Sequence, residues 1–331
     1  MTDAAPERRL AVLVLGMHRS GTSAVARLVS LLGADPPTDI LAGGDGNQAG
    51  YWEPGGLVAV HDRLLREIDS SWFDPRPPRL ARLADAARAG YLAELRQQLR
   101  TSFGRSACFV LKDPRICRMV PLYRRLLAGL GAEVRVVLVV RDPTAVARSL
   151  RRRNLLSLNF AGLLWASHTL AAERDTRDLP RVVVSYDALM EDWREPAGRL
   201  ARLLAPAVPP FDPAAMPSPI QPELRHHAPA TRRPFGSRLG VLLGAIHDAL
   251  AGGMPPERLD RLGERHRRIL AATRDLWTIE FRAQQLMPPW PHGEPPDPVA
   301  LRYALARALD RLHHSALAAG RADLPARGAP T

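Results

Sequence analysis

Short apolar runs alternate with longer amphipathic segments up to about residue 205. The runs are rich in β-branched residues and occupy residues 10–15, 107–112, 134–140 and 181–185. Each is followed by apolar residues at three- and four-residue spacing, which predicts helices near residues 21–33, 116–130, 143–153 and 187–204. Strands that alternate with helices, without hairpin turn signals, predict an α/β fold with a parallel sheet.

The remaining segments have mostly helical patterns. Helical spacing is predicted for residues 57–101, broken by a proline-rich stretch, for 158–176, for 238–287 and for a last helix near 298–318. Two proline-rich connectors separate the later helices. The changes in composition predict an α/β core over 1–205, a connector over 206–237, a helical C-terminal region over 238–320 and a disordered tail over 321–331.

Composition narrows the class of protein. The chain has 331 residues, of which 46% are hydrophobic, enough for a sizeable core. No apolar run approaches the roughly 18 to 20 residues that span a bilayer, and the N-terminus has no signal-peptide pattern. The two cysteines, Cys108 and Cys117, cannot make a disulfide framework. These features predict a cytoplasmic protein without stable membrane insertion.

The formal net charge of +12 is compatible with anionic partners. Alanine, proline and arginine are abundant throughout, as in a GC-rich bacterial genome, so most arginines are expected on solvated helix faces. Lys112 is the only lysine. A site that needs a compact ammonium rather than a planar guanidinium would explain this exception. With 5% aromatic residues, the chain offers little for base stacking, so no nucleic-acid partner is predicted.

A glycine loop, GMHRSGTS at residues 16–23, follows the first strand and opens a helix. Backbone N–H groups at a helix start bind anions, and Gly16 and Gly21 permit a tight turn. A kinase loop would carry lysine at position 22, where this chain has Thr22; Arg19 supplies the positive charge instead. The alternative is an ordinary strand-to-helix turn.

A second anion site is indicated after the third strand. Arg141 stands at the strand end and Ser149 lies eight residues on, in the following helix. Arginine forms charge-assisted forks to phosphate, and serine offers a hydroxyl. Two alternatives remain: Arg141 caps neighbouring carbonyls, or Asp142 is a Walker-B-type acid.

These two motifs, in this order, resemble those of the sulfotransferases that use 3′-phosphoadenylyl sulfate (PAPS), in the bacterial branch of the family. Their 5′-phosphosulfate loop reads Lys or Arg, Ser, Gly, Thr, then Thr or Ser. The resemblance covers residues 10 to about 205 and implies a P-loop NTPase-like parallel sheet flanked by helices, with a helical C-terminal elaboration. It implies PAPS as co-substrate and no required metal. The residues it assigns to PAPS are Arg19, Ser20, Gly21, Thr22 and Ser23 for the 5′-phosphosulfate, Arg141 and Ser149 for the 3′-phosphate, and Tyr186 near the nucleotide.

The triplet Lys112-Asp113-Pro114 resembles the tyrosylprotein branch, which implies that Lys112 neutralises the bridging oxygen of the donor. Asp113 is predicted to be a helix N-cap. Two interpretations of Arg115 stay open. Either it contacts the sulfuryl group or an acidic substrate, or it lies on the surface. Tyr186 is equally compatible with a core aromatic.

The acceptor needs a base to take its proton. Glu53, shortly after the loop, resembles the glutamate base of several bacterial and tyrosylprotein sulfotransferases, and His61 is the rival by analogy with the cytosolic branch. A helix N-terminal acid is the alternative role of Glu53. Weaker candidates for contacts with phosphate or acceptor are His18, His226, His227, Arg232 and Arg233.

The sequence therefore predicts a sulfotransferase that moves the sulfuryl group of PAPS to a hydroxyl or amine of a small-molecule or glycan acceptor: a carbohydrate, lipid, peptide tyrosine or natural product. Two alternatives stay open. One is a divergent P-loop small-molecule kinase using ATP and Mg²⁺; the other is a non-catalytic polyanion-binding protein. The C-terminal helices are expected to line the acceptor site or to form a homo-oligomer contact.

Overall fold

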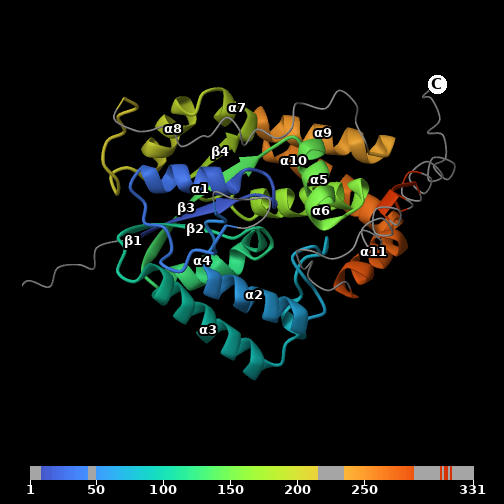
Figure 1. The fold of residues 1–331 in the computed structure, drawn as a ribbon, viewed down its shortest axis with the longest axis horizontal. Helices are drawn as coiled ribbons and strands as arrows, with labels where there is room; N and C mark the ends of the chain where they lie inside the picture. The colour runs from blue at the N-terminus through green and yellow to red at the C-terminus, as the bar shows by residue number, and fades with distance from the viewer. Residues whose placement is uncertain are drawn as a thin grey trace, which may run out of the picture. The chain divides into compact units, whose positions relative to one another are not determined.

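The four apolar runs form one parallel sheet, as their pattern predicts (Figure 1). In this computed structural model the strand order is β2-β1-β3-β4. The strands are β1 (Arg9–Leu15), β2 (Cys108–Lys112), β3 (Ala132–Val140) and β4 (Arg181–Ser185). All three pairings are parallel, so the expected α/β class with a helix-flanked parallel sheet is confirmed.

The structure describes residues 9–43, 50–214 and 235–286, together with residues 306, 307, 309–311 and 314. The chain divides into two compact units. The first consists of Met1–Arg141 with Ser167–Ala228, and the second of Asp142–Ala166 with Pro229–Thr331. Residues 142–166 group with the C-terminal part of the chain in this division.

Helices cover both faces of the sheet in the first unit (Figure 1). One face carries α1 (Thr22–Leu31), α7 (Tyr186–Glu191) and α8 (Arg194–Leu204). The other carries α4 (Val120–Ala128), with α3 (Asp85–Phe103) and α2 (Gly55–Glu67) beyond it. Because both faces are buried, the strands are apolar throughout instead of alternating with polar residues.

Two helices predicted as continuous are each divided. In the segment near 187–204, α7 ends before Asp192, whose side chain accepts a hydrogen bond from the Arg194 amide at 3.0 Å. Such local side-chain bonds compete with helical hydrogen bonds. The segment near 116–130 begins as a 3₁₀ turn, η2 (Pro114–Arg118), and continues as α4. A second 3₁₀ turn, η1 (Leu80–Arg82), lies in the proline-broken segment before α3.

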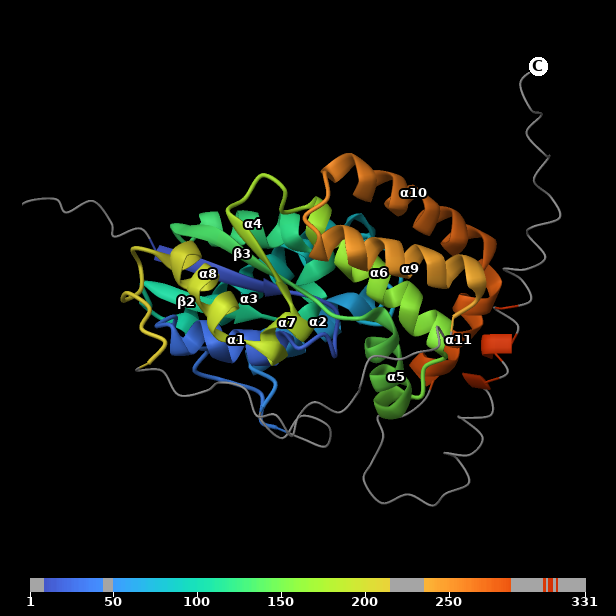
Figure 2. The ribbon, with the colours of Figure 1, turned by 90° about the horizontal axis from the view of Figure 1, so that it is seen from above.

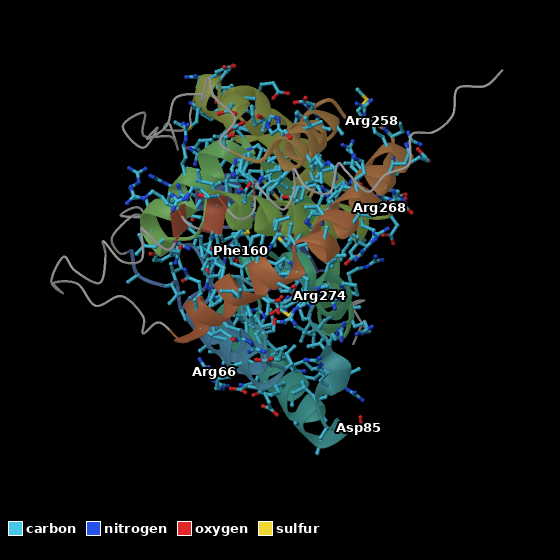
Figure 3. All side chains as sticks on the ribbon, turned by 90° about the vertical axis from the view of Figure 1, so that its right-hand side faces the viewer. Arg66, Asp85, Phe160, Arg258, Arg268 and Arg274 are labelled. Atoms are coloured by element: carbon cyan, nitrogen blue, oxygen red, sulfur yellow. The ribbon has the colours of Figure 1, made fainter. Side chains whose placement is uncertain are left out.

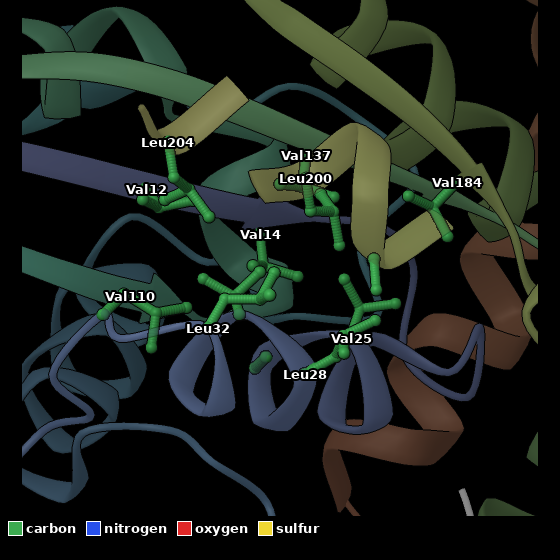
Figure 4. Packing of buried hydrophobic residues seen from close by; sticks show 14 of the residues in the cluster. Val12, Val14, Val25, Leu28, Leu32, Val110, Val137, Val184, Leu200 and Leu204 are labelled. Carbon is green, nitrogen blue, oxygen red and sulfur yellow. The ribbon is translucent and has the colours of Figure 1, made fainter. Parts of the chain in front are cut away.

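The core of the first unit lies between the sheet and helices α1 and α8 (Figure 4). Alternate residues of the strands face these helices and pack against their leucines and valines. The labelled members are Val12, Val14, Val110, Val137 and Val184 from the sheet, Val25 and Leu28 from α1, Leu32 after it, and Leu200 and Leu204 from α8. Each such side chain, fully buried, stabilises the fold by roughly 1.5–3 kcal/mol.

The second unit is helical. It contains α5 (Pro143–Asn154), α9 (Ser237–Ala251), α10 (Pro256–Ala272), α11 (Arg274–Leu286) and the first residues of α6 (Leu158–Arg174), which crosses the division. Helices α9 and α10 lie side by side (Figure 2). A Cβ at Gly162 of α6 would stand 2.8 Å from the Leu243 side chain and 3.0 Å from that of Phe235. Helix α6 therefore packs closely against Phe235 and α9 within the second unit.

Arginines of the second unit lie where the composition predicts. Arg258 and Arg268 on α10 and Arg274 on α11 are exposed (Figure 3). Arg268 pairs with Glu264 one turn away, at 3.7 Å. Such exposed ion pairs contribute little to stability. These arginines lie on solvated helix faces.

Among the described helices, none alone has the length and apolar composition to cross a bilayer. Helices α5 and α6 reach that length and composition only as a pair, and they are bent by 117° at the break between them.

Two leucines of α1 provide a matched test of the core. Leu28 is fully buried, whereas Leu31 is 41% exposed. We expect Leu28→Ala to lower the free energy of unfolding by about 2–5 kcal/mol, because a cavity remains between α1 and the sheet. Leu31→Ala should change it by no more than about 0.5 kcal/mol. Urea unfolding followed by circular dichroism measures both; equal losses at the two positions would contradict this packing.

Candidate functional site

The glycine loop turns sharply between β1 and α1. Arg19 and Gly21 both have left-handed backbone conformations, with φ of 70° and 88°, and the Ser20 amide donates to the Met17 carbonyl at 3.1 Å. A positive φ is uncommon for a residue other than glycine, and such conformations gather at functional sites. Alternating right- and left-handed residues direct successive N–H groups into one concavity that suits an anion.

Each glycine of the loop is required by a close approach. A Cβ at Gly16 would stand 2.8 Å from the Val139 carbonyl oxygen, while the Gly16 amide donates to Cys117 Sγ at 3.1 Å. A Cβ at Gly21 would stand 2.1 Å from Cδ2 of Tyr186. The Tyr186 ring therefore lies directly against the loop, at the start of α7.

Arg141, at the end of β3, joins the same group. Its Nη1 donates to the Arg19 carbonyl at 3.0 Å, and its guanidinium lies 4.2 Å from the centre of the Tyr186 ring. Arg141 and Tyr186 are both buried. The structure thus brings together the loop, Arg141 and Tyr186, and Arg141 also bonds a carbonyl, the alternative role weighed for it.

The loop suits an anionic ligand in one further respect. The Ser20 hydroxyl is buried, and among the described residues it has no hydrogen-bond partner. Buried hydroxyls without a partner are rare, because desolvation costs about 1–3 kcal/mol. A phosphate or sulfate oxygen at the loop would accept this bond beside the charges of Arg19 and Arg141.

Lys112 lies at the end of β2, beside β1, and its ammonium contacts the loop. Its Nζ is 2.5 Å from Glu53 Oε1, 3.0 Å from the Tyr51 carbonyl and 3.5 Å from Ser23 Oγ. Ser23 also donates to the Tyr51 carbonyl at 3.1 Å. Lys112 and Glu53 are both buried, so this ion pair is shielded from solvent.

Glu53 does not cap helix α2, the alternative weighed for it. The first amides of α2 are satisfied by Asp39: the Gly55 amide donates to its carbonyl and the Gly56 amide to its carboxylate, both at 2.8 Å. The second carboxylate oxygen of Glu53 lies 3.6 Å from Arg115 Nη1. Glu53 therefore stands between two cations, Lys112 and Arg115.

Asp113 is the predicted N-cap of the turn after β2: its carboxylate accepts from the Arg115 amide at 2.9 Å. It also contacts His61 Nδ1 at 2.7 Å, and the other ring nitrogen of His61 is 2.5 Å from the Tyr123 hydroxyl. Burial alone would raise the pKa of Asp113, but the charges of Arg115 and His61 hold it well below its usual range. His61 is fully buried with both ring nitrogens engaged.

Arg115 is buried as well, in contrast to the surface position considered for it. It makes two bonds to the Asp62 carboxylate, at 2.8 and 3.1 Å, and one to Asp113 at 3.1 Å. Burial would lower the pKa of Arg115, but Asp113, Asp62 and Glu53 together raise it above its ordinary value. Arg115 is thus held by Asp62 and Asp113, and its Nη1 lies 3.6 Å from Glu53.

The remaining predicted site residues are Ser149, His18 and four residues between 226 and 233. Ser149 is buried in α5 of the second unit, so its role beside Arg141 stays a prediction. His18 contacts the ring of Trp72. Outside the described residues lie His226, His227, Arg232 and Arg233. Within the described ranges, no three His, Cys, Asp or Glu side chains are grouped so as to hold a metal ion.

Comparison with known proteins gives distant structural similarity. No protein-family model matches the chain, and no curated protein matches it. The sulfotransferase domain of the olefin synthase from Synechococcus PCC 7002 is similar at 17% identity and a TM-score of 0.37, over 73% of this chain and 96% of that one. Sulfotransferase STF9 from Mycobacterium avium is similar at 17% identity and a TM-score of 0.34, over 62% of this chain and 66% of that one. A sulfotransferase domain from the curacin biosynthetic pathway is similar at 15% identity and a TM-score of 0.39, over 78% of this chain and 97% of that one. At these scores, the chemistry has to be argued from the side chains.

Cys117 reports on the packing around the loop, and Cys108 on the packing at the start of β2. Burial raises the pKa of Cys117 to about 12 and that of Cys108 to about 11. Since the thiolate is the reactive form, neither cysteine should react with Ellman's reagent at pH 8 in the folded protein. Both should react once the chain is unfolded in guanidinium. Rapid stoichiometric labelling of Cys117 in the native protein would show that the turn behind Gly16 is open.

Proposed function

We propose that this protein is a PAPS-dependent sulfotransferase. The observation that supports it most is the meeting of the Arg19 loop, Arg141 and the Lys112–Glu53 pair at the carboxyl ends of β1, β3 and β2. The connections of the sheet diverge between β1 and β3, since β2 lies to one side and β4 to the other. Ligands of parallel α/β folds bind at such points.

The position of the ammonium favours sulfuryl transfer over the kinase alternative. A kinase loop uses its own lysine for phosphate and the next hydroxyl for Mg²⁺. Here the corresponding hydroxyl, Ser23 Oγ, is engaged by Lys112 and by the Tyr51 carbonyl. Asp142, the Walker-B candidate, caps α5 by accepting from the Ala145 amide at 2.8 Å. Both groups that a kinase needs for magnesium are thus occupied by protein contacts.

The donor carries two anionic ends, and the site offers a group of partners for each. Residues 19–23 would hold the 5′-phosphosulfate through backbone amides, the Arg19 guanidinium and the Ser20 hydroxyl. Arg141 would bind the 3′-phosphate, with Ser149 as its predicted partner. Tyr186 would stay beneath Arg141 and support its orientation.

In the reaction the acceptor oxygen attacks sulfur, and the bond from sulfur to the bridging phosphate oxygen breaks. Glu53 would take the acceptor proton, and Lys112 would neutralise the charge that develops on the bridging oxygen of the leaving 3′,5′-ADP. As in phosphoryl transfer, positioning and charge neutralisation dominate such a step. Lys112 contacts Glu53 at 2.5 Å, so these roles require Lys112 to turn from Glu53 toward the donor.

Nucleotide selectivity tests the proposed donor. We expect 3′,5′-ADP to bind without metal, and 5′-ADP to bind more weakly with or without Mg²⁺. Arg141→Ala should weaken 3′,5′-ADP binding roughly 10- to 100-fold, because charge-assisted hydrogen bonds are lost. Arg100→Ala, on an exposed position of α3, should leave it unchanged. Isothermal titration calorimetry measures each dissociation constant.

The alternatives give different results in the same titrations. Preference for 5′-ADP with Mg²⁺ would replace the sulfotransferase by the kinase. Binding of neither nucleotide, together with salt-sensitive binding of heparin, would support the polyanion-binding protein.

Glu53→Gln tests the base separately from donor binding. The amide keeps the shape of the carboxylate but cannot take the acceptor proton. We expect kcat for transfer from PAPS, with an acceptor found in a panel of hydroxyl compounds, to fall roughly 100- to 10,000-fold. The dissociation constant of 3′,5′-ADP should be unaffected. Glu94→Gln, on α3, is the matched control; an unchanged kcat in Glu53→Gln would remove Glu53 from the mechanism.

A further inference from the structure

Two aromatic side chains beside the glycine loop have no part in the donor site. The Trp72 ring lies 4.6 Å from the His18 ring, centre to centre, at an angle of 59°. The Phe73 ring lies 5.3 Å from that of Trp72, at 88°. All three residues are half-buried. Trp72 and Phe73 therefore form a partly exposed right-angled corner, which we call the aromatic corner, next to the loop.

The backbone of this corner is held by Arg118, a buried residue at the end of η2. Its Nη2 donates to the carbonyls of Ser71 at 2.8 Å and Trp72 at 3.4 Å. Its Nη1 donates to the carbonyls of Asp74 and, at 2.8 Å, Arg76. Burial lowers the pKa of Arg118 to about 10, a measure of how far its charge is withdrawn from water. A segment fixed in this way needs little ordering when a ligand binds.

The polar side chains of the same segment are engaged within it. Asp74 accepts from Ser70 Oγ at 3.0 Å and from Arg76 at 2.8 and 2.7 Å. Ser71 Oγ accepts from the Phe73 amide at 3.2 Å. What the segment presents to a ligand is therefore mainly the apolar surface of its two rings.

The aromatic corner and the proposed base are positioned by one turn. Arg118 and Arg115 both belong to η2, which begins two residues after Lys112. Arg115 contacts Glu53, and Arg118 holds the Trp72 backbone. One turn thus contacts both the proposed base and the backbone that carries the aromatic corner.

We propose that the aromatic corner is the acceptor-binding surface and that the acceptor carries its hydroxyl on a planar aromatic ring. This deepens the proposed function and rests on it. An aromatic ligand can stack on one ring of a right-angled pair and meet the edge of the other, and both arrangements are favourable. A sugar would need hydrogen-bond partners for its other hydroxyls, and the polar groups of this segment are engaged internally.

The test uses 2-naphthol as the aromatic probe and methyl glucoside as the sugar probe, each titrated into protein saturated with 3′,5′-ADP. We expect saturable binding of 2-naphthol and none of methyl glucoside. Trp72→Ala should weaken 2-naphthol binding roughly tenfold or more, whereas Trp72→Phe should keep it within about threefold. The 3′,5′-ADP dissociation constant should stay the same in both. Tyr91→Ala removes a half-buried ring on α3 and should change neither affinity.

Three results would overturn the proposal that the aromatic corner binds the acceptor. They are no saturable binding of 2-naphthol, the same 2-naphthol affinity in Trp72→Ala as in the wild type, or tighter binding of methyl glucoside than of 2-naphthol. If Trp72→Ala also abolishes binding of 3′,5′-ADP, the milder substitution Phe73→Leu is tested instead. An unchanged affinity of Phe73→Leu for 2-naphthol then rejects the proposal. Failure of the wild-type protein to bind 3′,5′-ADP would instead reject the donor assignment on which the proposal rests.

Discussion

Compensation of buried charge in the turn after β2 is the constraint on which the site depends. Residues 112–118 bury four charged side chains: Lys112, Asp113, Arg115 and Arg118. A buried charge is tolerated only when it is paired or hydrogen-bonded, and removing one partner typically costs about 3–5 kcal/mol. The partners lie before α2, on α2 and in the segment of Trp72. Ion pairs and hydrogen bonds therefore hold three separate segments at one edge of the sheet.

Sheet topology explains why distant parts of the sequence meet at that edge. The connection from β1 runs to β2 on one side, and β3 is followed by β4 on the other. The strand ends then converge whatever the length of chain between them. The loop follows β1, Arg141 follows β3, and Tyr186 follows β4, where its ring fills the space that a side chain at position 21 would occupy. Backbone geometry thus brings the loop, Arg141 and Tyr186 together at the ends of neighbouring strands.

The parts of this structure that depend on local chemistry were predictable from sequence. β-Branched runs gave the strands, and the Asp-Pro pair gave the N-cap at Asp113. Partners brought in by tertiary structure were not. Asp39, which caps α2, lies 17 residues before Gly56 in the sequence, and Arg118 resembles any other of the chain's many arginines until its carbonyl partners are known. The close approach of Leu243 and Phe235 to Gly162 likewise depends on tertiary structure.

The ammonium of the site comes from a neighbouring strand and not from the loop, and its position is therefore set by strand register. Val14 of β1 is paired with Lys112 of β2. A slip of one residue would turn every side chain of β2 to the opposite face of the sheet. Hydrophobic burial would resist such a slip only weakly here, because both faces are apolar. The hydrogen bonds between β1 and β2 fix the register of the two strands. They therefore also determine where the Lys112 ammonium lies.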